Sequence, residues 1–165
     1  MKKTFTSLAL CAAVASLLAA CGGGGSDSPD PSSRTSAVAL SEATVLTLNG
    51  AYGSTETGIS DVNELQDIGG DKCDFSFNNV VKTGDTSTVI SGNVTYNENA
   101  TTLALTTFTI NGAGYSMGSN GDNTTVDRTS NRVTFNGKLF TAIAGSDTFK
   151  VTGYLPMKGN RPNGC

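Results

Sequence analysis

Short strand-like runs separated by turn residues fill this chain from about residue 37 onward, and they restrict what it can fold into. Runs rich in Val, Ile, Thr, Phe and Tyr alternate with clusters of Gly, Asn, Asp and Ser. Such spacing is typical of many short antiparallel strands. About seven or eight strands in one unit fit an antiparallel β-sandwich, with a small β-barrel as the alternative. The sequence therefore predicts a single all-β domain over residues 37–165.

The period-2 pattern predicts which residues face the core. Alternate apolar residues are expected to point inward along the strands, with this set as the clearest: Cys73, Phe75, Phe77, Ile90, Val94, Tyr96, Phe149, Val151, Leu155. Within Leu103–Ile110 the apolar residues change from odd to even positions, which predicts a β-bulge near Thr106 or Thr107. Asn136-Gly137 is the preferred pair for a two-residue type I′ turn and predicts a hairpin over residues 132–143.

One short helix is expected beside the strands. Asp61 is a suitable N-cap, and Glu64 three residues later completes a capping box. Val62, Leu65 and Ile68 follow at helical spacing before Gly69-Gly70. The pattern predicts a short helix across one end of the sandwich or barrel.

The first twenty residues have the pattern of a signal peptide. Lys2 and Lys3 precede an apolar stretch that ends in small residues, and that stretch is too short for a permanent transmembrane helix. Leu18-Ala19-Ala20-Cys21 resembles the lipobox of bacterial lipoproteins. The resemblance implies cleavage before Cys21, acylation of that cysteine, and a protein anchored by lipid in the outer membrane. Attachment through several acyl chains holds a protein stably.

Residues 21–36 are expected to be a lipidated cysteine, Cys21, followed by a tether. The stretch from Gly22 to Ser36 is rich in Gly, Ser and Pro and has no apolar periodicity, which is typical of a flexible linker. The tether would hold the domain away from the membrane, facing either the periplasm or the exterior. An envelope protein is the expected partner, besides the membrane itself.

Of the four cysteines, Cys11 lies within the signal peptide and Cys21 in the lipobox. Cys73 and Cys165 remain, and an exported chain with two thiols is expected to join them in a disulfide. Neither lies in a Cys-x-x-Cys motif, so we expect a structural bond rather than a redox centre.

Composition excludes several classes of activity. The chain has no His, so neither a Ser-His-Asp triad nor a Cys-His pair is possible. Its net charge of −3 argues against nucleic-acid binding, which depends on Lys and Arg. The polar loop Ser119–Asp127 offers oxygen atoms but lacks the spacing of an EF-hand, so no metal and no cofactor are expected.

Three functions are compatible with these features. The preferred one is a non-enzymatic interaction domain, with Tyr52 and Tyr115 in Gly-rich segments as candidate exposed contacts. The alternative is a carrier for a small apolar ligand or lipid, in which Gly92 and Gly153 would open an interior void. A glycan hydrolase using two carboxylates is the third, and these acids are its candidates: Asp61, Glu64, Asp67, Asp71, Asp74.

Overall fold

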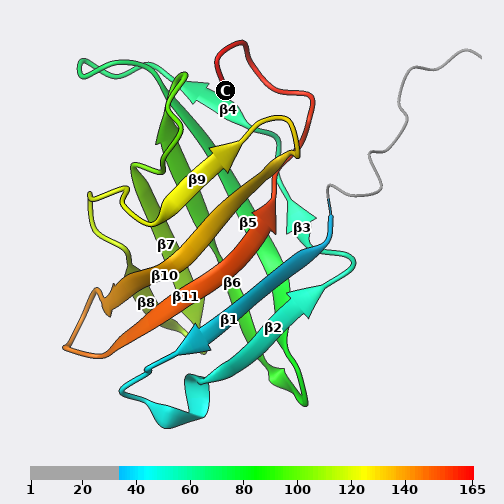
Figure 1. The fold of residues 1–165 in the computed structure, drawn as a ribbon, viewed down its shortest axis with the longest axis vertical. Helices are drawn as coiled ribbons and strands as arrows, with labels where there is room; N and C mark the ends of the chain where they lie inside the picture. Colours follow the sequence, from blue (N-terminus) through cyan, green and yellow to red (C-terminus); the bar gives the residue numbers. More distant parts are fainter. Residues whose placement is uncertain (1–33) are drawn as a thin grey trace, which may run out of the picture.

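A computed structural model describes residues 34–165, and over that range the chain is all-β (Figure 1). The strands are β1 (Ser36–Ser41), β2 (Gly50–Ser54), β3 (Gly58–Ile59), β4 (Asn63–Leu65), β5 (Lys72–Lys82), β6 (Asp85–Asn97), β7 (Leu105–Ile110), β8 (Ala113–Ser116), β9 (Thr124–Asp127), β10 (Arg132–Ala142) and β11 (Thr148–Pro156). A single 3₁₀ turn, η1 (Leu46–Leu48), is the only helical element of this range. The predicted signal peptide, Cys21 and nearly all of the tether lie outside the described residues.

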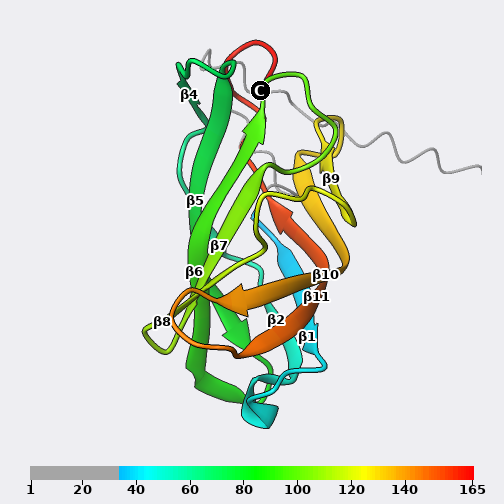
Figure 2. The same cartoon turned by 90° about the vertical axis from the view of Figure 1, so that its left-hand side faces the viewer.

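Eight strands of the described range close into an antiparallel barrel. The order is β11-β1-β2-β5-β6-β7-β8-β10, and pairing of β10 with β11 completes the ring. Figure 2 shows the strands inclined around a common interior, with β3, β4 and β9 added at the margins. The sandwich preferred from sequence is not what forms. The same alternation suits both architectures, and only the pairing of β11 with β1 and β10 closes the sheet.

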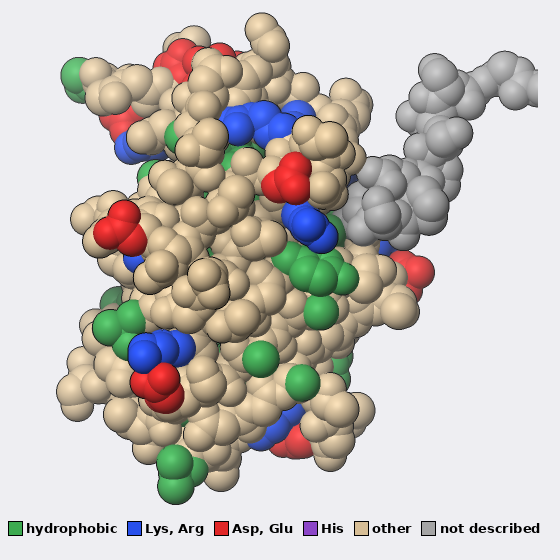
Figure 3. Space-filling model, viewed as in Figure 1, with side chains coloured by type: hydrophobic (Ala, Val, Ile, Leu, Met, Phe, Trp, Pro, Cys, Tyr) green, Lys and Arg blue, Asp and Glu red, His purple; other side chains and the backbone are tan. Residues whose placement is uncertain are grey.

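The predicted inward residues are confirmed, and most of them are fully buried. Aromatic rings fill the interior: the ring centroid of Phe108 lies 4.5 Å from that of Phe140 and 5.5 Å from that of Phe77, and Phe140 lies 5.6 Å from Phe149. On the face drawn in Figure 3, hydrophobic side chains form only small separate patches among polar side chains, charged side chains and backbone. Aromatic side chains therefore occupy the interior where a carrier would hold its ligand.

Two local predictions about the strands are wrong. Asn136-Gly137 forms no turn: β10 continues through it, and a β-bulge shifts the register between Asn136 and Lys138. Gly137 adopts φ +68°, the conformation that a bulge and a type I′ turn both require. β7 carries no bulge, because its register with β6 is continuous and Leu103 lies before the strand.

The helix expected from Asp61 does not form. Asn63–Leu65 pairs instead with residues 72–74 of β5 as strand β4, and a turn near Gly70 connects the two. Val62 is buried, but Leu65 and Ile68 are 47% and 108% exposed. Pairing with a long strand outweighs a local capping pattern in a segment that is too short for a stable helix.

Gly92 on β6 does not open an interior void. It allows β6 and β7 to approach each other closely. A Cβ atom at this position would lie 1.9 Å from the main-chain oxygen of Thr107 and 3.0 Å from the Phe77 ring. Gly153 is similarly crowded, since its Cβ would lie 2.1 Å from the oxygen of Ala37. Both glycines are therefore sites of tight packing rather than openings for a ligand.

We expect Gly92→Ala to lower the free energy of unfolding by about 1–3 kcal/mol, because the methyl group must displace backbone across the β6–β7 pair. Gly69→Ala is the matched control: its Cβ would meet nothing within 4 Å. Urea denaturation of both variants measures the difference. Equal stability of the two variants would show that the β6–β7 contact is looser than the structure has it.

Candidate functional site

The predicted disulfide is confirmed. Cys73 on β5 and Cys165 are bonded through their sulfur atoms, with their Cα atoms 5.5 Å apart. Both residues are buried at the end of the barrel that the C-terminal segment crosses (Figure 1). The bond therefore ties residues 157–165 across this end, which fits the structural role expected from the sequence.

Arginine side chains hold the same segment. The Arg128 guanidinium donates to the main-chain oxygens of Ala100 (2.7 Å), Gly164 (2.9 Å) and Cys165 (3.0 Å). It also lies over the Tyr96 ring, 5.4 Å from its centroid. The Tyr96 hydroxyl donates to the same Cys165 oxygen at 2.7 Å. These contacts hold the C-terminal segment across this end of the barrel.

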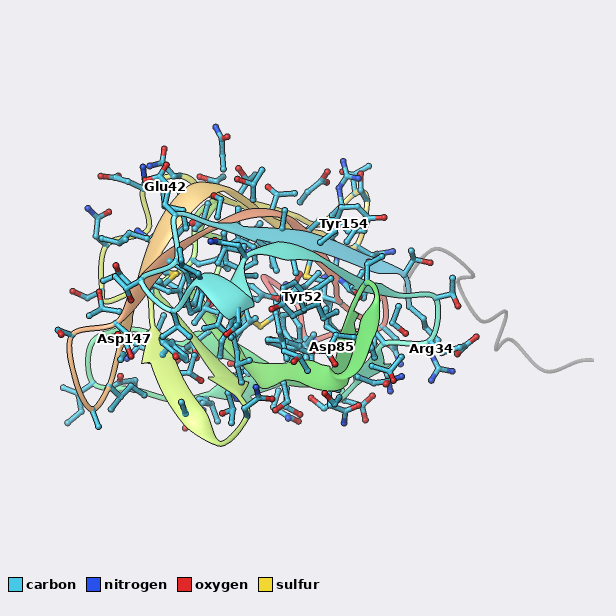
Figure 4. All side chains as sticks on the ribbon, turned by 90° about the horizontal axis from the view of Figure 1, so that it is seen from below. Arg34, Glu42, Tyr52, Asp85, Asp147 and Tyr154 are labelled. Carbon is cyan, nitrogen blue, oxygen red and sulfur yellow. A yellow bond between two sulfur atoms is a disulfide. The ribbon has the colours of Figure 1, made fainter. Side chains whose placement is uncertain are left out.

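Tyr52 and Tyr115, expected to be exposed, are buried at 2% and 4% exposure. The Tyr52 hydroxyl donates to the main-chain oxygen of Leu48 at 2.8 Å, and the side chain lies within the ring of strands near Asp85 (Figure 4). Burial, and then the negative charge of Asp85, raise the pKa of Tyr52 to about 12. The glycines beside both tyrosines lie within strands rather than loops, so these rings belong to the core.

Three of the five candidate acids are each engaged by a different partner. Asp61 pairs with Lys158 at 2.8 Å and Asp67 pairs with Lys72, while the Asp74 carboxylate accepts from Asn93 and Thr95. In residues 34–165, no group of three or more potential metal-ligating side chains comes together. These carboxylates have the environment of surface groups rather than that of a paired acid and base.

A break in the barrel wall is the most distinctive feature of the outer surface. β8 and β9 both pair with the edge of β10 that faces away from β11: Ser116 lies opposite Thr141, and Thr124 lies opposite Phe135. Seven residues, 117–123, thus pass five residues of β10, 136–140. Residues 119–123 of the polar segment Ser119–Asp127 thus belong to an excursion within one interrupted strand, and Thr124–Asp127 forms β9 (Figure 1).

The excursion leaves a hollow of about 450 Å³, which we call the wall hollow. It opens to the surface between the loop and the second half of β10. Its lining is mixed apolar and polar: Ser116, Met117, Gly118, Asn120, Lys138, Leu139, Thr141, Ala142, Ile143. Leu139 and Ile143 are 51% and 68% exposed. The volume lies in the range of small-ligand and side-chain pockets.

Lys138 is buried in the wall hollow at 6% exposure. The bulge at Gly137 turns it to the inward face of β10, where it lies opposite the buried Val151. Its ammonium donates to the main-chain oxygen of Asn120 in the loop. Over residues 34–165, Lys72, Lys150 and Lys158 each form an ion pair, whereas Lys138 and Lys82 donate to main-chain oxygens instead.

Sequence reasoning placed Lys138 beside an assumed turn at Asn136-Gly137, and so did not recognise it as a residue within a continuous strand. A one-residue bulge at Gly137 would have kept Val133, Phe135, Lys138 and Phe140 on one strand with a common inward face. The signal was a single lysine within an otherwise apolar inward series.

Chemically, the wall hollow offers several kinds of contact to a ligand. An ammonium within a partly apolar hollow offers charge, hydrogen-bond donors and a hydrophobic rim to one ligand group.

The described part of the chain has no helix long and apolar enough to cross a membrane. Comparisons with protein-family models, with curated protein sequences and with solved structures found no match to this chain.

Proposed function

We propose that this protein is a non-enzymatic interaction domain, anchored by lipid at Cys21 in the outer membrane and binding a protein partner at the wall hollow. The observation that carries the proposal is the exposure of Leu139 and Ile143 beside the break between β8 and β9. Large apolar side chains grouped at a surface hollow are typical of binding sites.

A rigid scaffold supports this function. The closed barrel, the aromatic core and the disulfide hold β10 in place, so the rim of the hollow is preorganised for a partner. Preorganised surfaces lose less conformational entropy on association. A tether between the anchor and the barrel would let the domain reach a partner in the envelope.

The alternative functions gain no support of this kind. A carrier needs an interior volume, and the Phe rings occupy that volume. A hydrolase needs two carboxylates held across a groove, and three of the candidate acids, Asp61, Asp67 and Asp74, are each engaged by a different partner. Interaction at the wall hollow is therefore the function that the geometry favours.

Site-specific photo-crosslinking in intact cells tests the proposal. A photoreactive amino acid replaces Leu139 in the full chain, and Leu65 on β4 is the control position because its exposure, 47%, is close to the 51% of Leu139. We expect a discrete crosslinked protein from position 139 and none of that size from position 65. Identical products from both positions, or none from 139, would contradict the proposal.

A further inference from the structure

We infer that the wall hollow binds a carboxylate, and that Lys138 is the residue that recognises it. The inference rests on the proposed function and specifies its chemistry: the partner inserts the side chain of an Asp or Glu while an adjacent apolar side chain contacts Leu139 and Ile143.

The first argument is the cost of the buried charge. Burial of an ammonium is unfavourable unless a counter-charge or several hydrogen bonds compensate it. Lys138 is only 6% exposed. Within residues 34–165 its ammonium has one hydrogen-bond acceptor, the neutral main-chain oxygen of Asn120. An ammonium has three N–H donors, so two remain for a ligand.

The second argument is charge complementarity at a single point. The hollow contains one cation and no carboxylate among its lining residues. A monoanionic carboxylate matches one ammonium in charge, whereas a phosphate is usually held by several cations or by a series of main-chain N–H groups. Met117, Leu139 and Ile143 line the same hollow and make its wall partly apolar, and a less polar surrounding strengthens an ion pair.

The third argument concerns the rim. Leu139 neighbours Lys138 along β10 but points to the outer face, where it is 51% exposed, and Ile143 lies just beyond the end of the strand. A carboxylate held at Lys138 therefore leaves the adjacent partner residue beside two apolar side chains. An acidic residue next to a leucine or a similar residue satisfies both requirements.

NMR titration of the full chain with two capped dipeptides tests the inference. The probes are N-acetyl-leucyl-glutamate amide and its glutamine analogue, observed through the methyl signals of Met117 and Ile143. We expect saturable shifts with the glutamate probe and at least tenfold weaker binding of the glutamine probe, because only the former carries charge. Equal affinity for the two probes would overturn the inference, as would stronger binding of inorganic phosphate.

Variants of Lys138 identify the receptor. Lys138→Met should remove the preference for glutamate, and Lys138→Arg should retain it. Lys150→Met is the control, because Lys150 is a partly exposed lysine paired with Glu42. The melting temperature of Lys138→Met should equal or exceed that of the parent, since an uncompensated buried charge is lost. A lower melting temperature with unchanged probe binding would identify Lys138 as a structural clamp on Asn120 and refute the inference.

The two proposals fail separately. Crosslinking at position 139 with no preference for the glutamate probe would leave the interaction function standing and remove the carboxylate. A clear preference for glutamate with no crosslinked partner would retain the site and remove the protein partner.

Discussion

Replacement of Cys73 and Cys165 by serine is expected to lower the free energy of unfolding by about 4–5 kcal/mol, the chain-entropy value for a closed loop of roughly this size. The bond spans 92 residues, so its loss frees most of the described chain in the unfolded state. Native contacts of the C-terminal segment are expected to persist, because Arg128 and Tyr96 still bind the main chain of residues 164 and 165. Urea denaturation of the parent and the double variant measures the loss.

Reduction provides the control for this experiment. Dithiothreitol should shift the unfolding midpoint of the parent toward that of the double serine variant and leave the variant itself unchanged. If the variant unfolds at the same urea concentration as the oxidised parent, the disulfide contributes nothing to stability. The Arg128 and Tyr96 contacts would then hold the end of the barrel by themselves.

Strand existence could be predicted from sequence here, but strand continuity could not. Phe75 and Phe77 face the same side of their strand, as do Phe149 and Val151, because side chains two residues apart share a face of a β-strand. This pattern is local and can be read from the sequence. Asn136-Gly137 is different, because a type I′ turn and a β-bulge both require a positive φ at Gly137. The choice depends on whether Phe140 pairs with Phe149 of the following strand, and that contact is not encoded near residue 137.

The candidate site could not be predicted from sequence for the same reason: it depends on pairing between strands that are far apart in the chain. Closure of the barrel required β1 to pair with β11 across more than a hundred residues of sequence, which no local pattern specifies. The buried Tyr52 and Tyr115 were misjudged because neighbouring glycines suggested loops. Lys138 became visible as a site residue only when the bulge turned it inward beside the excursion of residues 117–123.

Phe108→Ala should be the most damaging single substitution in the core, with an expected loss of about 3–5 kcal/mol in the free energy of unfolding. Phe108 is fully buried, and its ring contacts those of Phe77, Phe135 and Phe140 at centroid distances of 5.5, 5.9 and 4.5 Å. Because these rings come from strands β5, β7 and β10, a cavity at their centre weakens contacts across the whole barrel. Thermal and urea denaturation measure the loss.

Leu105→Ala is the matched control, since Leu105 lies on the same strand but is 41% exposed; its loss should stay within about 0.5 kcal/mol. Comparable effects of the two substitutions would show that the aromatic cluster does not carry the stability of the barrel. The Phe108→Ala variant also tests the interior directly. A new apolar cavity that binds benzene or xenon, with no such binding by the parent, would show that the native Phe rings fill the space that an apolar ligand would need.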